Sequence, residues 1–209
     1  MNSAAEHKDP LRHQMRATLD ALGPTSVSAL PARIAEHILE HQLVDSAIAD
    51  GRLTAVFAPL RPTSTGRPPR SEVHLSGLAE SLLATGAPVG MYRITGPREM
   101  HVARIAHWPD DLEYGPTGIP SVRAHCPAVP PADLAGAVLL IPGLAFDARG
   151  GRLGRGGGYF DTFLAPLRAL STPPTLLGVG FACQIVPAVP LDAWDIPMDV
   201  IITEDGPLA

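Results

Sequence analysis

The sequence predicts an α/β fold with a mostly parallel central sheet flanked by helices. Short apolar runs that end in turn residues alternate with longer segments of helical spacing, which is the pattern of strands joined by crossover helices. The runs 137–141 and 176–181 contain only apolar residues and glycine, as expected of strands buried on both faces. With 209 residues, 45% of them hydrophobic, the chain can form one substantial core. We therefore expect a single domain over residues 1–209.

Two helices are expected before the first strand. Asp9 and Pro10 have the residue types of an N-cap and a first helical position. One apolar stripe follows them, formed by Leu11, Met15, Leu19 and Leu22. A Gly-Pro pair ends this helix, and residues 28–43 carry the second apolar stripe. Lys8 and Arg12 lie at the start of the first helix, where the residues alone favour a solvated basic end.

The second helix contains the string H-x-x-E-H, formed by His37, Glu40 and His41. In one family of metalloproteases this string binds zinc through its two histidines and supplies a general base. However, Ile38 is the residue in phase with the core, so both histidines lie off the apolar stripe. We interpret them as part of a solvent-facing helix surface and keep zinc chemistry as the alternative.

The middle of the chain begins with an expected strand at 53–58. A Pro-rich basic loop at 61–71 follows, and it cannot continue a central strand because proline has no N–H to donate. We then expect a helix at 75–85, strands at 88–94 and 100–108, and a turn-rich segment at 112–131.

A glycine-rich stretch at 149–164 lies between the strand at 137–141 and a helical pattern that begins at Tyr159. Its glycines let backbone N–H groups approach a ligand closely, and the following helix offers unpaired N–H groups and the positive end of its dipole. Arg152 and Arg155 add positive charge, so the stretch suits phosphate. It matches neither common phosphate-binding motif. An arginine- and glycine-rich surface loop therefore remains the alternative.

Beyond this helix, we expect the strand at 176–181, a proline-punctuated loop at 187–197 and a short final strand at 200–203. The loop contains Asp192 and Asp195.

The composition of the chain argues against several classes of function. The net charge is −5 and there is no long basic run, so nucleic acid is not an expected partner. Two cysteines cannot form a disulfide framework, and their spacing suggests no C-x-x-C metal site. The first residues are polar, and no apolar stretch approaches the length of a membrane span. We expect a cytoplasmic enzyme or binding protein with no membrane partner.

The stretch 142–161, P-G-L-A-F-D-A-R-G-G-R-L-G-R-G-G-G-Y-F-D, resembles the signature of the 5-formyltetrahydrofolate cyclo-ligase family, also called methenyltetrahydrofolate synthetases. Further segments resemble the family in the same order along the chain, at 8–12, 53–58, 115–120, 181–185 and 191–197. The resemblance implies an α/β fold similar to the NagB/RpiA/CoA-transferase-like fold.

The resemblance also implies a set of site residues. ATP would be bound by Lys8, Arg12, Arg152, Gly154, Arg155, Gly156, Gly157, Gly158, Tyr159 and Asp161. Among these, Lys8 and Arg155 would also have catalytic roles. The folate would contact Leu60, Glu72, Gly156 and Tyr159, and Mg²⁺ would be held by Asp161 and Asp195.

The implied activity is ATP- and Mg²⁺-dependent conversion of 5-formyltetrahydrofolate to 5,10-methenyltetrahydrofolate, with release of ADP and phosphate. The chain departs from the family pattern in the inserted loop at 61–71, and at Ser121, Phe160 and Thr162. Two alternatives therefore remain open, a non-catalytic folate or nucleotide binder and a ligase of the same fold that acts on another N-formyl substrate. A monomer or a weak homodimer is expected.

Overall fold

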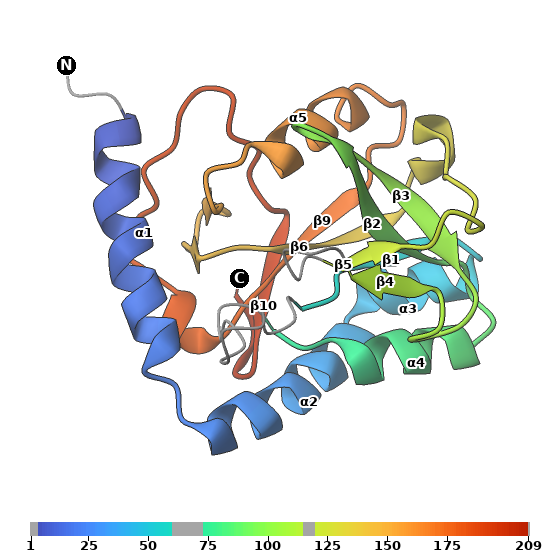
Figure 1. Cartoon of the computed structure of the whole chain (residues 1–209), viewed down its shortest axis with the longest axis horizontal. Helices are drawn as coiled ribbons and strands as arrows, with labels where there is room; N and C mark the ends of the chain where they lie inside the picture. The colour runs from blue at the N-terminus through green and yellow to red at the C-terminus, as the bar shows by residue number, and fades with distance from the viewer. Residues whose placement is uncertain (1–3, 60–72, 115–119, 209) are drawn as a thin grey trace.

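The computed structural model describes residues 4–59, 73–114 and 120–208 (Figure 1). The buried apolar side chains of these residues form one continuous core. The inserted loop at 61–71, together with Leu60, Glu72 and residues 115–119, lies outside the described residues. None of the helices in the described ranges has the length and apolar character that a membrane span requires.

A seven-stranded sheet organises the chain, with strand order β11-β10-β9-β6-β1-β2-β3. Its strands are β1 (Thr54–Val56), β2 (Val89–Gly96), β3 (Glu99–Ile105), β6 (Val138–Pro142), β9 (Thr175–Val179), β10 (Val200–Thr203) and β11 (Gly206–Leu208). The five strands from β10 to β2 are mutually parallel, and the two edge strands, β3 and β11, run antiparallel to their neighbours. The predicted, mostly parallel central sheet is confirmed.

Helices cover both faces of this sheet (Figure 1). They are α1 (Ala4–Asp20), α2 (Pro24–Glu40), α3 (Gln42–Ala49), α4 (Ser76–Ala84) and α5 (Tyr159–Leu167). Helices α2, α3 and α4 lie along one face, where they contact β10, β1, β6 and β2, and α5 packs on the other face against β3. Helix α1 stands beside the sheet and contacts the short 3₁₀ helix η2 (Ala182–Gln184). The predicted arrangement of helices flanking a sheet is therefore present.

Strand β6 lies at the centre of the core. All four of its residues from Val138 to Ile141 are 0% exposed. A parallel strand covered by helices on both faces has no solvent-facing side, which explains why this run contains no polar residue. The expected strand positions at 53–58, 137–141, 176–181 and 200–203 are confirmed to within a few residues at each end.

Both N-terminal helices differ from the expected ones. Helix α1 begins at Ala4, so Pro10 lies inside it and Asp9 is not an N-cap. Proline at this position cannot donate to the carbonyl of the residue four before it, and its ring crowds that carbonyl. The expected helix at 28–43 is two helices, because His41 adopts an extended backbone conformation and its Nδ1 accepts a hydrogen bond from the Leu43 N–H at the start of α3.

Short strand pairs occupy two segments that the sequence did not predict as strands. The turn-rich segment contains the antiparallel pair β4 (Leu112–Tyr114) and β5 (Pro120–Val122), followed by the 3₁₀ helix η1 (Pro131–Leu134). The glycine-rich stretch contains the pair β7 (Ala145–Phe146) and β8 (Arg152–Leu153). Strands of two or three residues are too short to show a periodic pattern.

Candidate functional site

The strand order reverses between β1 and β6. From β1 the sheet continues outward through β2 and β3, whereas from β6 it continues through β9, β10 and β11 in the opposite direction. Open α/β sheets bind ligands in the crevice outside the carboxyl ends of the strands at such a reversal. The glycine-rich loop follows β6 at this edge, and the segment that contains Leu60 and Glu72 follows β1. The glycine-rich loop and the chain that follows β1 therefore leave the sheet at the same edge.

Asp147 anchors the glycine-rich loop. Its side chain is fully buried, and its carboxylate accepts hydrogen bonds from the backbone N–H groups of Arg149 (2.9 Å), Gly151 (3.0 Å) and Val189 (2.7 Å). Burial alone would raise the pKa of Asp147, but these three donors, with the Arg149 side chain, lower it below its usual value. One carboxylate thus closes the turn and joins it to the loop at 187–197.

Gly150 lets the turn of the glycine-rich loop pack closely against Met198, which directly follows the loop at 187–197. Its φ is +84°, and a Cβ atom there would lie 2.3 Å from the Met198 carbonyl oxygen. The Met198 N–H donates to the Gly150 carbonyl at 2.8 Å. Any side chain at this position would force the two segments apart, so the loop's shape depends on glycine here.

The outer part of the loop leads into α5 as predicted. Gly158 is the N-cap of α5 and has a left-handed conformation, with φ of +71°. The first N–H groups of any α-helix lack acceptors within the helix. The predicted order of strand, glycine-rich loop and helix is confirmed, and the N-terminus of α5 lies at the end of the loop.

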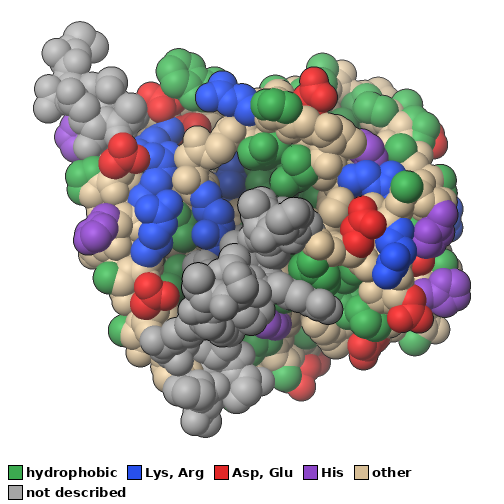
Figure 2. Space-filling model, viewed as in Figure 1, with side chains coloured by type: hydrophobic (Ala, Val, Ile, Leu, Met, Phe, Trp, Pro, Cys, Tyr) green, Lys and Arg blue, Asp and Glu red, His purple; other side chains and the backbone are tan. Residues whose placement is uncertain are grey.

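Arg12 and Arg98 approach this loop from two sides. The Arg12 Nε donates to the Gly154 carbonyl at 3.0 Å. A Cβ on Gly156 would lie 3.5 Å from the Arg12 guanidinium carbon, and one on Gly158 would lie 3.6 Å from the Arg98 Nε. Figure 2 shows Lys and Arg side chains gathered on the α1 side of this face, beside a hollow in the surface. Arg98 was missed because it lies in the turn between β2 and β3, where no motif marks it.

Arg152 is held rigidly beneath the loop. Its side chain is 4% exposed, and its Nη2 donates to the Asp161 carboxylate at 2.9 Å. The guanidinium carbon also lies 5.4 Å from the centre of the Phe160 ring. Within the described part of the chain, the buried Arg152 Nε–H has no hydrogen-bond partner. Buried donors in native proteins almost always have a partner, so this N–H suggests a ligand oxygen.

Lys8 joins α1 to the loop at 187–197. Its ammonium group donates to the carboxylates of Asp192 (2.7 Å) and Asp195 (2.5 Å). Burial would lower the pKa of Lys8, but the hydrogen bonds to both aspartates raise it above its usual value. Lys8 is 8% exposed, so the interpretation as a solvated basic end is wrong for this residue. Asp192 was not among the predicted ligands, and its contact with Lys8 spans 184 residues of sequence.

The remaining predicted loop residues occupy the same region. Arg155 is exposed between Gly154 and Gly156, and a Cβ on Gly157 would contact the ring of Tyr159, the first residue of α5. The two predicted metal ligands form ion pairs with different residues: Asp161 pairs with Arg152, and Asp195 pairs with Lys8.

The histidines of H-x-x-E-H lie in different local structures. His37 is in α2, with its Nε2 3.3 Å from the Glu204 carbonyl oxygen, whereas His41 caps α3. Both are half-buried, so the expectation of a fully solvent-facing pair is only partly correct. Neither belongs to a metal-binding group of three or more ligands within the described ranges.

Comparisons with solved structures support the fold. The chain is similar to the NMR structure of Aquifex aeolicus 5,10-methenyltetrahydrofolate synthetase, with a TM-score of 0.75 and 26% identity over 96% of this chain and 91% of that one. The structure of a 5,10-methenyltetrahydrofolate synthetase from Mycoplasma pneumoniae gives a TM-score of 0.67 at 20% identity, over 94% of this chain and 98% of that one, and supports the fold alone.

Sequence comparisons cover between about a third and nearly all of the chain. The 5-formyltetrahydrofolate cyclo-ligase of Saccharomyces cerevisiae is 26% identical over 95% of this chain and 96% of its own length. The mouse enzyme of the same name is 39% identical over 71 residues, which is 34% of this chain and 35% of the relative. Thus the chain spans about a third of the mouse relative in that alignment. The model of the 5-formyltetrahydrofolate cyclo-ligase family matches residues 4–204, and the chain therefore belongs to that family.

Proposed function

We propose that the chain catalyses the ATP-dependent conversion of 5-formyltetrahydrofolate to 5,10-methenyltetrahydrofolate, a reaction of folate one-carbon metabolism that releases ADP and phosphate. One observation carries this proposal. In a chain that belongs to this family, a glycine-rich loop and a helix N-terminus lie at the reversal of the sheet, with Arg12 and Arg152 beside the loop.

The loop region supplies what a triphosphate requires. Phosphoryl transfer depends mainly on positioning and on stabilisation of negative charge. Arg12 reaches the loop from α1, and Arg152 is held beneath it with a free Nε–H among the described residues. Gly156 and Gly158 bring backbone N–H groups and the start of α5 toward the same place. We assign ATP to this region, with Arg155, Gly154, Gly157 and Tyr159 completing the contacts.

Asp161 and Asp195 have the chemistry of a magnesium site. Mg²⁺ prefers oxygen ligands and is commonly held by one or two carboxylates beside substrate phosphates. Asp161 is paired with Arg152 and Asp195 with Lys8, so a magnesium ion would share these carboxylates with their cations or displace them. When bound here, Mg²⁺ would neutralise charge on the phosphates. The donor set fits this role.

The proposed reaction begins when the formyl oxygen of the folate attacks the γ-phosphorus of ATP and ADP leaves. N10 of the folate then adds to the activated formyl carbon and loses its proton, the five-membered ring closes, and phosphate departs. Arg155 would stabilise the charge on the transferring phosphoryl group. Lys8 would hold the carboxylates of Asp192 and Asp195 in position through its ion pairs with both.

We assign the folate to the neighbouring side of the same edge. Strand β1 pairs directly with β6, so the segment after β1 begins beside the glycine-rich loop. Leu60 and Glu72 belong to that segment, and Gly156 and Tyr159 would contact the folate from the loop side. We further propose that the enzyme works in the cytoplasm as a monomer or weak homodimer, and its net charge of −5 is consistent with the absence of a nucleic-acid partner.

Absorbance in the methenyl-folate band tests this proposal after protein, ATP, Mg²⁺ and 5-formyltetrahydrofolate are mixed. We expect the band to appear only when all four are present, with one ADP formed for each methenyl group. A protein that binds ATP and folate without forming the band would instead be a non-catalytic binder. ATP hydrolysis with another N-formyl compound, and none with 5-formyltetrahydrofolate, would reassign the substrate.

A further inference from the structure

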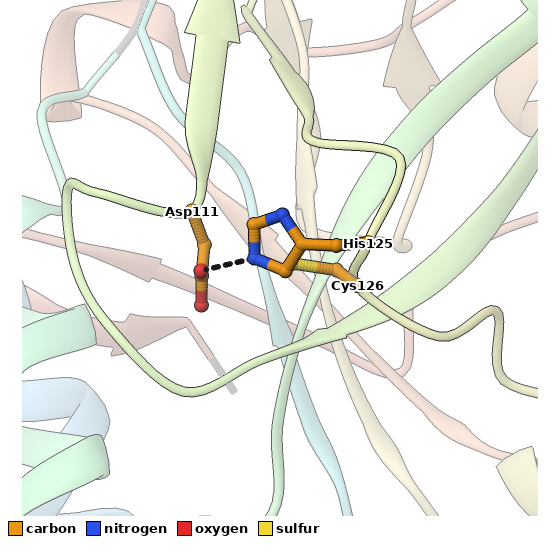
Figure 3. A group of neighbouring side chains, drawn as sticks. All are labelled: Asp111, His125 and Cys126. Atoms are coloured by element: carbon orange, nitrogen blue, oxygen red, sulfur yellow. Dashed lines mark hydrogen bonds and ion pairs between the residues drawn. The ribbon is translucent and has the colours of Figure 1, made fainter.

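A cluster of three metal-ligating side chains lies at the base of the β4–β5 hairpin. Asp111 directly precedes β4, and His125 and Cys126 follow the end of β5. Leu112 pairs with Val122 in the antiparallel ladder, so these flanking residues meet at the same end. The Asp111 Oδ1 lies 3.0 Å from the His125 Nε2, and the ligand atoms of all three residues lie within 4.8 Å of one another (Figure 3).

The two oxygens of Asp111 have different partners. Oδ2 accepts the backbone N–H groups of Ala106 (2.7 Å) and His107 (2.8 Å), which leaves Oδ1 directed at His125. The backbone therefore orients this carboxylate, as outer-shell donors orient metal-binding carboxylates.

Cys126 is fixed in place, whereas His125 can move. Cys126 is 4% exposed, its N–H donates to the Arg123 carbonyl at 3.1 Å, and its own carbonyl accepts from the Arg93 Nη2 at 3.0 Å. The side chain of His125 is 65% exposed. Two ligands are thus preorganised, and the third can adjust from the solvent side.

We propose that Asp111, His125 and Cys126 bind a zinc ion, with water in the fourth position. Thiolate, imidazole and carboxylate are the ligand types that zinc takes, at about 2.0–2.3 Å. Tetrahedral bonds of that length separate the ligand atoms by about 3.3–3.8 Å. The present limit of 4.8 Å requires only a small closing movement, which the exposed His125 ring can supply. A thiolate and an imidazole together disfavour Mg²⁺ and Ca²⁺.

This site is distinct from the proposed ATP and magnesium region. In Figure 1, β4 and β5 lie on the side of the molecule away from α1, which carries Lys8 and Arg12. A zinc ion would join the chain before β4 to the chain after β5, and so hold the base of the hairpin closed. The inference does not depend on the proposed reaction, because its ligands contribute nothing to that chemistry.

Calorimetry and metal analysis on the full chain, first stripped with a chelator, test the site. We expect one Zn²⁺ per chain, and Co²⁺ in its place should give a thiolate-to-cobalt absorption band. Cys126→Ser should abolish that band. His125→Ala should weaken zinc binding at least tenfold, because loss of an outer-shell partner alone costs about 10–100-fold. His125 is exposed, so without metal this variant should melt like the metal-free wild-type protein.

Matched variants decide whether the site is specific. Cys183→Ser removes the other cysteine, which is exposed, and His13→Ala removes an exposed histidine of α1. Both should keep the wild-type stoichiometry and affinity. The proposal is overturned if no stoichiometric zinc binds, if His125→Ala and Cys126→Ser bind it like wild type, or if Cys183→Ser loses the cobalt band.

Discussion

The inner turn of the glycine-rich loop, residues 145–153, and its rim are held by different kinds of contact. We define the rim as Lys8, Arg12, residues 154–161 and residues 191–195. In the inner turn, the buried Asp147 carboxylate binds backbone N–H groups and Gly150 packs directly on a backbone carbonyl. At the rim, Lys8 pairs with Asp192 and Asp195, and Asp161 pairs with Arg152 of the inner turn.

We infer from this difference that the inner turn fixes the conformation of the loop and that the rim binds the ligands. A ligand cannot replace the hydrogen bonds of Asp147 to Gly151 and Val189 without unfolding the turn, because these donors belong to the backbone. The rim aspartates are 12–27% exposed, so water, phosphate or a metal ion can exchange with their partners. Substitutions in the inner turn should therefore reduce stability, and substitutions at the rim should reduce ligand affinity.

The largest effect is expected for Asp147→Ala. The change leaves the N–H groups of Gly151 and Val189 buried without acceptors, and each such group costs about 1–3 kcal/mol. We expect the free energy of unfolding to fall by about 2–6 kcal/mol in urea titrations. Asp133→Ala, at an exposed aspartate of η1, is the control and should change it by less than about 0.5 kcal/mol. A loss for Asp147→Ala no larger than the control's would show that the turn does not need its anchor.

The Asp147 carboxylate should also make the free energy of unfolding depend on pH. The pKa of Asp147 is lower in the folded protein than its unfolded value of about 3.9, so its stabilisation is complete above that pH. Stability should be lost as the pH falls through the folded pKa. The unfolding free energies of the wild type and Asp147→Asn should therefore converge in acid, and a constant difference down to low pH would contradict this.

At the rim, Arg155→Ala should weaken ATP binding and leave the fold intact. Arg155 is exposed between two glycines, and loss of a charge-assisted contact costs about 1.5–3 kcal/mol. That corresponds to about a 10–150-fold loss of ATP affinity in calorimetry. Arg16→Ala, an exposed arginine one turn beyond Arg12 on α1, should bind ATP like wild type. Unchanged affinity with a normal melting curve would remove Arg155 from the site.

The sequence predicted those parts of the fold that depend on local pattern. Buried parallel strands are apolar throughout, so 137–141 and 200–203 could be located closely. The start of α1 could not be, because Asp9 and Pro10 carry a valid N-terminal pattern that the actual helix passes through. Short strands such as β7 and β8 depend on pairing across the loop and not on their own residues.

The sequence could locate only that part of the candidate site which lies in one contiguous motif. The resemblance at 142–161 identified the loop, and Arg152 and Asp161 lie in contact there. Asp147, Asp192 and Arg98 were missed because their roles come from tertiary contacts. Asp147 reaches Val189 across 42 residues of sequence, and no spacing within the chain signals such a pair. The metal-ligating cluster at Asp111 has the same origin.

A variant of Glu72 tests whether the segment after β1 binds the folate beside the rim. We predict that Glu72→Gln raises the folate KM or lowers turnover, with ATP affinity little changed. A carboxylate can accept two pterin N–H donors in one plane, and leaving such donors unpaired costs about 1–3 kcal/mol. The insertion at 61–71 need not displace Glu72, since longer loops cost only about 0.6 kcal/mol per doubling. Glu80→Gln on α4 is the control. Wild-type kinetics for Glu72→Gln would show that the folate is bound elsewhere.

The smallest effect is expected for His37→Ala combined with His41→Ala, which lie in neither the inner turn nor the rim. His41 caps α3 through its Nδ1, and loss of a cap costs about 0.5–2 kcal/mol. His37 approaches only the Glu204 carbonyl, at 3.3 Å. The double variant should therefore lose a little stability and keep full methenyl-forming activity. Its zinc content should equal that of wild type, because the inferred zinc ligands are Asp111, His125 and Cys126. Zinc and activity lost together in this variant would instead restore the H-x-x-E-H string as a metal centre, despite the helix break at His41.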